Sequence, residues 1–333
     1  MTTTLTRLFN ICWHRLEVPE DWKRGVIVKI PKKGDLSECG NWRGVTLLSI
    51  PGKVFCLILL NRLRAAVDER LREEQCGFRG ARPCSEQIFT LRNVIDQCMK
   101  FRTQLLINFV DFRKAFDSVH RESLWSILRI YGIPQPFVEI FKKLYKNSSC
   151  CVKTNAIHTT FFEVVTGVRQ GCVLSTLLFN VALDFIMRKS MKGDETGIKW
   201  SRTHRLTELD FADDVAIIAE NNGLLQQATT NLANEAKKIG LRLNPDKSKV
   251  ISIGKTDMNV DINVEASQLE TVHISSKYRV TRRECGIRNT NEDCEGFICV
   301  SEAWSNLELT VNRVEDKATA LPLNSSPDCC LHE

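Results

Sequence analysis

Apolar side chains recur at helical spacing over several stretches of the chain. A first stripe lies within residues 5–24, where Pro19 ends the helix, and Pro51 opens a longer helix that runs to Glu74. Further helices are predicted over residues 88–98, 124–131, 136–144, 174–187, 223–239 and 301–318. Such stripes are typical of helices that pack against a core.

Short apolar runs between these helices predict strands. They lie at residues 25–30, 104–112, 151–154, 160–165, 206–211, 215–219 and 250–253. The runs at 206–211 and 215–219 are separated by Ala212, Asp213 and Asp214, a segment short enough to be a tight hairpin turn. Helices therefore alternate with strands, which indicates an α/β fold.

The hairpin turn carries two adjacent carboxylates, Asp213 and Asp214. Like charges this close repel, so a cation is expected beside them, and Mg²⁺ prefers carboxylate oxygens together with substrate phosphates. The alternative is a solvated turn, because aspartate is common in turns. Asp111 ends the apolar strand at 104–112, and carboxylates on adjacent strands could hold a pair of metals ~3.5–4 Å apart for phosphoryl displacement.

Basic and glycine-rich loops supply candidate phosphate contacts. Lys29, Lys32 and Lys33 surround the end of the strand at 25–30, and Arg43 follows after a polar loop. Arginine binds phosphates through planar, bidentate donors, although a solvated basic loop explains the pattern equally well. Residues 167–172 (GVRQGC) bracket a polar segment with glycines before a helix, where a phosphate could bind or a plain turn could lie.

Composition indicates a globular chain with one large or two ordinary domains. Of its 333 residues, 43% are hydrophobic and 26% charged. No apolar run reaches the ~20 residues of a membrane span, and the N-terminus lacks a secretory signal. We therefore expect an intracellular protein, in nucleus or cytoplasm, whose fourteen cysteines are reduced. Cys285, Cys294, Cys299 and His332 match no common zinc spacing.

The charge is distributed unevenly. Residues 1–254 carry 38 Lys+Arg against 26 Asp+Glu, whereas residues 255–333 carry 8 against 14. A basic body fits a polyanionic partner such as nucleic acid, with an ordinary solvated surface as the alternative. The break near residue 255 predicts a boundary between domains at 1–255 and 256–333.

Seven blocks of the chain, in order, resemble the reverse transcriptase of non-LTR (LINE-type) retrotransposons. They are residues 30–35 (IPKKGD), 41–49 (NWRGVTLLS), 74–79 (EQCGFR), 109–118 (FVDFRKAFDS), 167–172 (GVRQGC), 211–214 (FADD) and 240–247 (GLRLNPDK). The resemblance covers residues 20–255. It implies a right-hand polymerase with α/β fingers and palm around a central antiparallel sheet, and an incomplete thumb. The implied activity is RNA-directed DNA synthesis with two Mg²⁺ ions, an RNA template, a DNA primer and dNTPs.

The resemblance also implies roles for single residues. Asp111 and Asp213 would hold the metals, with Asp214 completing the set and the Phe112 carbonyl as a further ligand. Phe116 resembles the steric gate that excludes a ribose 2′-hydroxyl. The remaining roles concern the nucleotide: Lys32 and Arg43 on the triphosphate, Gln170 and Gly171 in the template–nucleotide pocket, and Lys247, or alternatively Lys249, as proton donor to pyrophosphate.

The chain departs from the family pattern near its C-terminus. Residues 277–280 (KYRV) stand where the family usually has Tyr-Leu-Gly, and residues 256–333 are expected to be a degenerate thumb or a substituted, partly disordered tail. Two other functions stay open: a catalytically silent remnant that only binds RNA, and an RNA-templated RNA polymerase. The aromatic ring of Phe116 argues against the second.

Overall fold

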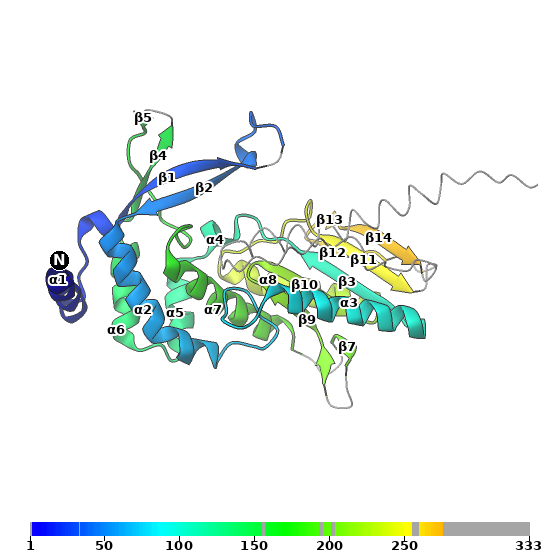
Figure 1. Ribbon diagram of the computed structural model, residues 1–333. Helices are drawn as coiled ribbons and strands as arrows, with labels where there is room; N and C mark the ends of the chain where they lie inside the picture. Colours follow the sequence, from blue (N-terminus) through cyan, green and yellow to red (C-terminus); the bar gives the residue numbers. More distant parts are fainter. Residues whose placement is uncertain are drawn as a thin grey trace, which may run out of the picture.

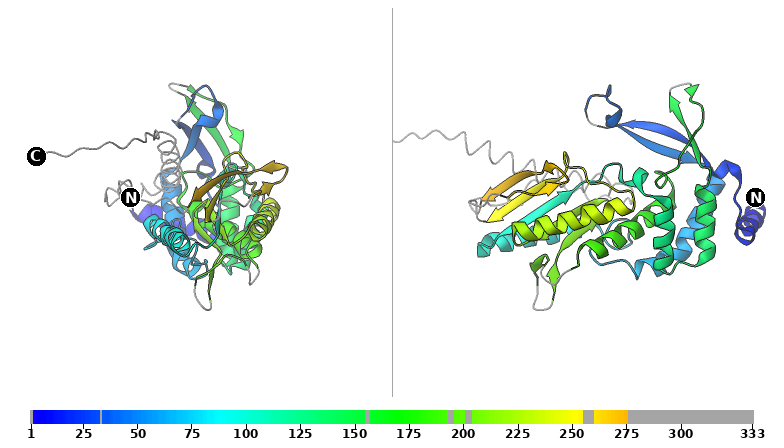
Figure 2. Two further views of the ribbon diagram at one scale, coloured as in Figure 1. Left: turned by 90° about the vertical axis from the view of Figure 1, so that its right-hand side faces the viewer. Right: turned by 180° about the vertical axis from the view of Figure 1, so that it is seen from behind.

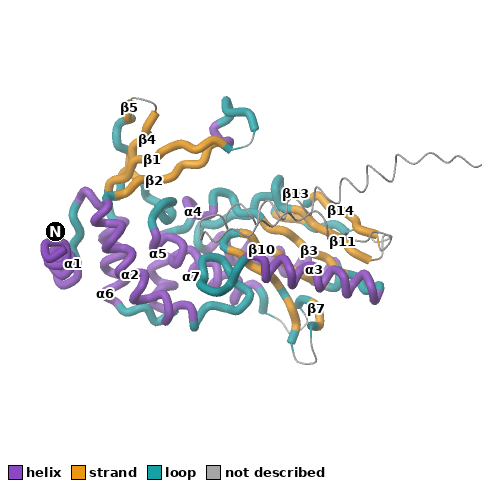
Figure 3. The backbone as a smooth tube through the Cα atoms, in the orientation of Figure 1, coloured by secondary structure: helices purple, strands orange, loops and turns teal. Residues whose placement is uncertain are grey.

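The structure is a computed structural model that describes residues 2–32, 34–154, 157–192, 196–200, 204–254 and 260–275. Its described residues form two five-stranded β-sheets and two small two-stranded ones, with helices between and around the larger two (Figures 1 and 3). The predicted helix at 301–318, the cysteine and histidine set at 285–332 and the departure at 277–280 lie outside the described residues.

One five-stranded sheet, which we call the fingers sheet, projects from the helical body (Figure 1). Its strands are β1 (Arg24–Pro31), β2 (Trp42–Leu48), β4 (Ser149–Thr154), β5 (Ile157–His158) and β6 (Phe162–Glu163). The order is β2-β1-β4-β5, with β6 also paired to β4. Strands β1 and β2 are antiparallel, and their hairpin extends over the other five-stranded sheet.

The second five-stranded sheet, the palm sheet, has the order β14-β11-β3-β10-β9. Its strands are β3 (Leu105–Val110), β9 (Glu208–Phe211), β10 (Asp214–Ala219), β11 (Lys249–Gly254) and β14 (Glu270–Ser275). The central strand β3 is antiparallel to both β10 and β11, while β14 adds to the edge in parallel with β11.

Helices cover both faces of the palm sheet, which explains why its strands are continuous apolar runs rather than alternating ones. Helix α3 (Cys84–Phe101) packs on Leu105 and Ile107 of β3. Helix α8 (Asn222–Lys238) covers the opposite face, which includes Leu106 and Val110 (Figure 2, right). The same strand thus contributes alternate residues to two different clusters.

A helical body joins the two sheets. Helix α7 (Val173–Ser190) is its centre, with buried residues on all sides and contacts to α2, α5 and α8. The other helices are α1 (Thr2–Arg15), α2 (Ile50–Asp68), α4 (Ala115–Ser118), α5 (Arg121–Ile130) and α6 (Gln135–Tyr145). Short elements complete the fold: 3-10 turns Glu20–Trp22 and Cys39–Asn41, and strands β7 (Ile198–Lys199), β8 (Arg205–Leu206), β12 (Asn263–Val264) and β13 (Ser267–Gln268).

The predicted helices and strands are present in the described part of the chain, but the prediction is incomplete. It lacks strands β2 and β14 and the two-residue strands β5, β7, β12 and β13, and the helix that begins near Pro51 ends at Asp68 rather than at Glu74. Residues 69–77 instead run in extended and turn conformations toward the palm sheet. The division at residue 255 stays a prediction. No described helix is long and apolar enough to cross a membrane.

Candidate active site

The three predicted carboxylates lie at one end of the palm sheet. Strands β3 and β10 are adjacent, with Val110 opposite Val215, so Asp111 after β3 lies beside Asp214 at the start of β10. Asp213 occupies the turn between β9 and β10, next to Ala212, whose φ of 58° is left-handed. Antiparallel pairing therefore brings together two aspartates that are 102 positions apart in the sequence.

Burial and like-charge repulsion both act on the carboxylates of this group. Burial raises the pKa of Asp214 to about 7, and the charges of Asp213 and Asp111 add to the rise. Burial also raises the pKa of Asp213, further raised by Asp111 and opposed by Arg43. Carboxylate oxygens are hard donors, which fit a divalent ion such as Mg²⁺.

The described residues contain no group of three or more His, Cys, Asp or Glu side chains that could hold a metal ion by themselves. Proteins usually bind Mg²⁺ through one or two carboxylates completed by substrate phosphates and water, so a metal here would need ligands from the substrate.

Asp111 is held by the loop that precedes β11. Its N–H donates to Ser248 Oγ at 3.1 Å, and Asn244 Nδ2 donates to its Oδ2 at 2.9 Å. The N–H of Asn244 also donates to the Asp111 carbonyl at 2.8 Å. The buried Phe112 pairs with Leu243 of the same loop. This loop fixes one carboxylate oxygen and leaves the other for a ligand.

Three predicted basic residues share the space in front of Asp111. Burial lowers the pKa of Lys32, the charges of Lys247 and Arg43 lower it further, and Asp111 opposes the change. Arg43 lies opposite Ile30 in the β1–β2 hairpin, so the fingers carry two of these cations and the palm the third. Lys249 instead forms an ion pair with Glu270 at 3.4 Å, which leaves Lys247 as the better-placed of the two lysines. Lys33 lies outside the described residues.

Phe116 belongs to an aromatic stack below this group. Its ring lies 4.4 Å from that of Phe179 at an interplanar angle of 16°, and Phe78 meets its face edge-on at 6.3 Å. These two ring contacts restrict the orientation of the Phe116 side chain.

Gln170 and Gly171 join the palm to the fingers. The Gln170 carbonyl accepts from the Thr46 N–H at 2.8 Å, and its Nε2 lies 3.3 Å from both carboxylate oxygens of Asp117. Gly171 has φ +106°, and a Cβ there would lie 2.4 Å from the Thr46 carbonyl oxygen. The contacts of these two residues are thus with strand β2 and Asp117, rather than with the three carboxylates.

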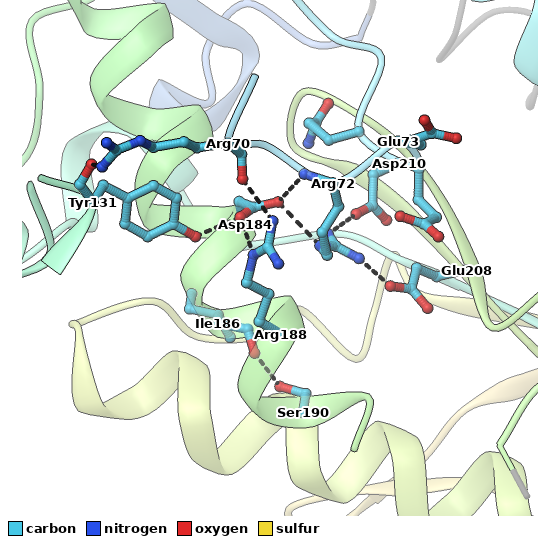
Figure 4. Close-up of polar contacts among 12 residues, drawn as sticks. Arg70, Arg72, Glu73, Tyr131, Asp184, Ile186, Arg188, Ser190, Glu208 and Asp210 are labelled. Atoms are coloured by element: carbon cyan, nitrogen blue, oxygen red, sulfur yellow. Dashed lines mark hydrogen bonds and ion pairs between the residues drawn. The ribbon is translucent and has the colours of Figure 1, made fainter. Parts of the chain in front are cut away.

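Sequence reasoning missed the segment that supports the turn from behind. Gln75, which is fully buried, accepts from the Ala212 N–H at 2.9 Å and donates to the Ala212 carbonyl at 3.1 Å. Nearby Arg72 forms ion pairs with Asp184, Glu208 and Asp210 (Figure 4). The available signal was the block at residues 74–79, which is part of the family resemblance but was given no role for Gln75.

Comparison with known proteins identifies relatives for most of the chain. The family described as "Reverse transcriptase (RNA-dependent DNA polymerase)" matches residues 30–284. The chain is 29% identical over 246 residues to the "Transposon TX1 uncharacterized 149 kDa protein" of Xenopus laevis, which covers 73% of this chain and 18% of that protein. It is also 29% identical over 240 residues to a Pol polyprotein from type-1 retrotransposable element R2 of Popillia japonica, covering 72% and 33%.

Solved structures support the fold. Telomerase from Candida albicans, in complex with a fragment of telomeric RNA, matches with a TM-score of 0.53 at 11% identity, over 80% of this chain and 48% of that one. Apo telomerase from Candida tropicalis matches with a TM-score of 0.52 at 16% identity, over 80% and 52%. The predicted α/β fold of right-hand polymerase type is confirmed. The chain spans 18% and 33% of the length of the two retrotransposon relatives above.

Proposed function

The chain belongs to the reverse transcriptase family, with relatives among the proteins of non-LTR retrotransposons, and we propose that it is the catalytic core of an RNA-directed DNA polymerase. The observation that supports this proposal most directly is the meeting of Asp111, Asp213 and Asp214 with three facing cations. Carboxylates with basic side chains in electrostatic range suit a metal-bound triphosphate.

We assign the carboxylates to metal binding. Asp111 and Asp213 would hold two Mg²⁺ ions, with Asp214 completing the set and the Phe112 carbonyl as a further oxygen. When bound, such ions lower the pKa of an attacking hydroxyl and stabilise charge on the transferred and leaving phosphates. The loop bonds of Asn244 and Ser248 to Asp111 keep its carboxylate oriented before the substrate arrives.

The fingers and the loop before β11 supply the groups that meet the triphosphate. Arg43 can bind its oxygens through paired donors, and Lys32 adds a second positive charge. Lys247 lies within electrostatic range of Lys32, and we assign it as the donor of a proton to the departing pyrophosphate. Gln170 and Gly171, tied to β2, would line the side of the pocket where template and nucleotide meet.

Substrate selection follows from the aromatic stack. The Phe116 ring is clamped between Phe78 and Phe179, so it cannot easily move aside for a ribose 2′-hydroxyl. Deoxynucleotides would therefore be preferred. The basic excess of residues 1–254 fits an RNA template paired with a DNA primer, and such binding should weaken steeply with salt as phosphate contacts release counterions.

Primer extension on an RNA template with Mg²⁺ tests the proposal. The parent protein should extend the primer, and Asp213→Ala should reduce the rate at least ~100-fold. Asp96→Ala, which removes an exposed aspartate on α3, serves as the matched control and should leave the rate unchanged. If the parent binds RNA but extends no primer, the alternative of a catalytically silent, RNA-binding remnant is correct.

A further inference from the structure

One buried amide satisfies the backbone of the catalytic turn. Gln75 is 0% exposed, and its Oε1 accepts from the N–H groups of Gly77 at 2.8 Å and Ala212 at 2.9 Å. Its Nε2 donates to the Ala212 carbonyl at 3.1 Å. The side chain of Gln75, from a distant part of the sequence, thus pairs both main-chain polar groups of Ala212, the residue that precedes Asp213.

The turn needs this partner for two reasons. Ala212 is 2% exposed, so water cannot readily satisfy its N–H and carbonyl, and a buried unpaired backbone group costs ~1–3 kcal/mol. Ala212 also has φ 58°, a left-handed conformation that an alanine adopts at some energetic cost. Without outside support, the turn would be free to relax to another conformation and carry Asp213 with it.

The supporting segment, residues 72–77, is itself anchored along β9. The Asp210 N–H donates to the Glu74 carbonyl at 3.1 Å, and the Cys76 N–H donates to the Asp210 carbonyl at 3.0 Å. These two bonds place Gln75 beside Asp210 as a short parallel bridge. Its position relative to the turn is therefore set by main-chain bonds, and not by side-chain packing alone.

The two ends of the segment are also held. Asn180 of α7 donates to the Gly77 carbonyl at 2.6 Å, and Gly77 approaches the turn so closely that a Cβ there would lie 2.0 Å from the Ala212 nitrogen. At the other end, Arg72 binds carboxylates of both β9 and α7 (Figure 4). The segment is thus a rigid frame that ends on the catalytic turn.

We propose that Gln75 is a positioning residue, which sets the place of the Asp213 carboxylate for metal binding by fixing the Ala212 backbone. The proposal rests on the proposed function, since it assigns Asp213 to a divalent metal. If Gln75 served stability alone, its replacement would lower the free energy of unfolding but would leave the metal concentration needed to half-saturate the folded protein unchanged.

The test compares two glutamines of similar burial. Gln87, 8% exposed, donates to the Glu74 carbonyl and to Cys76 Sγ, both at 2.8 Å, so it contacts the same segment without touching the turn. The variants Gln75→Met and Gln87→Met each remove a buried amide group, because methionine has nearly the same side-chain length as glutamine but no amide. Both should lower the melting temperature, but their effects on metal binding should differ.

Metal binding is measured without catalysis, as the rise in melting temperature with Mn²⁺ alone. The half-saturating Mn²⁺ concentration should increase at least ~10-fold in Gln75→Met, because a misplaced ligand loses its preorganisation, and should stay at the parent value in Gln87→Met. Gln75→Glu keeps the acceptor oxygen and loses the bond to the Ala212 carbonyl, so it should increase the half-saturating Mn²⁺ concentration by a smaller factor. This variant replaces Gln75→Met in the test if Gln75→Met does not fold.

Kinetics give a second readout. In primer extension, Gln75→Met should lower kcat ~100-fold with the KM for dNTP within ~3-fold, since triphosphate contacts come from the fingers. Failure of the parent to extend a primer would count against the proposed function and leave the Mn²⁺ titration to decide this proposal. Equal Mn²⁺ half-saturation in the parent and all three variants, or no response of the parent to Mn²⁺, overturns it.

Discussion

Replacement of Arg72 by methionine should destabilise the palm from behind the catalytic turn. The guanidinium lies 3.1 Å from Asp184 Oδ1 and 2.6 Å from Asp210 Oδ2, and it also pairs with Glu208 (Figure 4). Its side chain is 10% exposed, and those of the three carboxylates 0–3%. Methionine keeps most of the volume, so the change removes the charge while leaving the packing largely intact.

The magnitude depends on which carboxylates are left without a partner. Asp184 keeps Arg188 at 2.7 Å and the Tyr131 hydroxyl, so it is least affected. Burial raises the pKa of Glu208, which weakens its ion pair with Arg72. The loss falls mainly on Asp210, whose Oδ1 already has no hydrogen-bond partner among the described residues. Removal of one partner of a buried ion pair costs ~3–5 kcal/mol, and we expect the lower end, about 3 kcal/mol.

Urea unfolding followed by tryptophan fluorescence measures this loss. Without Arg72, the folded-state pKa of Asp210 rises further above its unfolded value, so the folded protein binds protons that the unfolded chain releases. That stability is lost as pH rises, and the cost of Arg72→Met should therefore be larger at about pH 8 than at about pH 5. The matched control Arg188→Met removes a half-exposed arginine from the same cluster and should cost about 1 kcal/mol or less. A cost for Arg72→Met no greater than for Arg188→Met, at either pH, would refute the reasoning.

Three further predictions concern the site itself. Phe116→Ala should raise incorporation of rNTP relative to dNTP at least ~10-fold in primer extension, and unchanged sugar selectivity would exclude Phe116 as the gate. Gly77→Ala places a Cβ 2.0 Å from the Ala212 nitrogen and should lower both the melting temperature and the extension rate; a normal rate in a folded variant contradicts the close approach. Burial and neighbouring carboxylates raise the pKa of Asp214 to about 7, so its stabilising protonation is lost as pH rises through 7. In EDTA, Asp214→Asn should therefore be more stable than the parent by ~1–2 kcal/mol at about pH 8, with the gain shrinking toward pH 4, as urea titrations at each pH can check.

Local pattern was sufficient to predict the hairpin and its carboxylates. Continuous apolar runs on each side of Ala212, Asp213 and Asp214 are typical of buried strands joined by a short turn, and β9 and β10 have this form. The aspartate after β3 was found in the same way. Adjacency of β3 and β10 was a hypothesis, because the pairing of strands far apart in sequence depends on the whole sheet, and the register of Val110 with Val215 confirms it.

The sequence pattern did not predict strand β2 or the correct end of helix α2, because their environment departs from the usual pattern. Strand β2 belongs to a projecting hairpin with solvent near both faces, so Trp42–Leu48 shows no regular alternation of buried and exposed residues. The helix after Pro51 appeared to continue through Leu71, which has helical spacing from Val67. Leu71 is indeed buried at 8% exposure, but it reaches the core from a chain that has already left the helix. Apolar spacing records burial, and burial does not require a continuous helix.

The misjudged helix end and the catalytic turn are parts of one structural problem. Asp111, Asp213 and Asp214 repel one another, and the left-handed Ala212 adds local strain, so an isolated hairpin would relieve both by opening the turn. Catalysis by positioned charge requires the opposite, because ligands must be in place before the substrate binds. A helix continued to Glu74 would satisfy its own backbone groups internally. Because the helix ends at Asp68, the N–H and carbonyl groups of residues 72–77 are available to bond β9. The same path of the chain brings the Gln75 amide to Ala212. The early helix end therefore supplies the support that the strained turn needs. Replacement of Gln75 should release the turn, while the main-chain bonds of the segment to β9 keep the helix end in place.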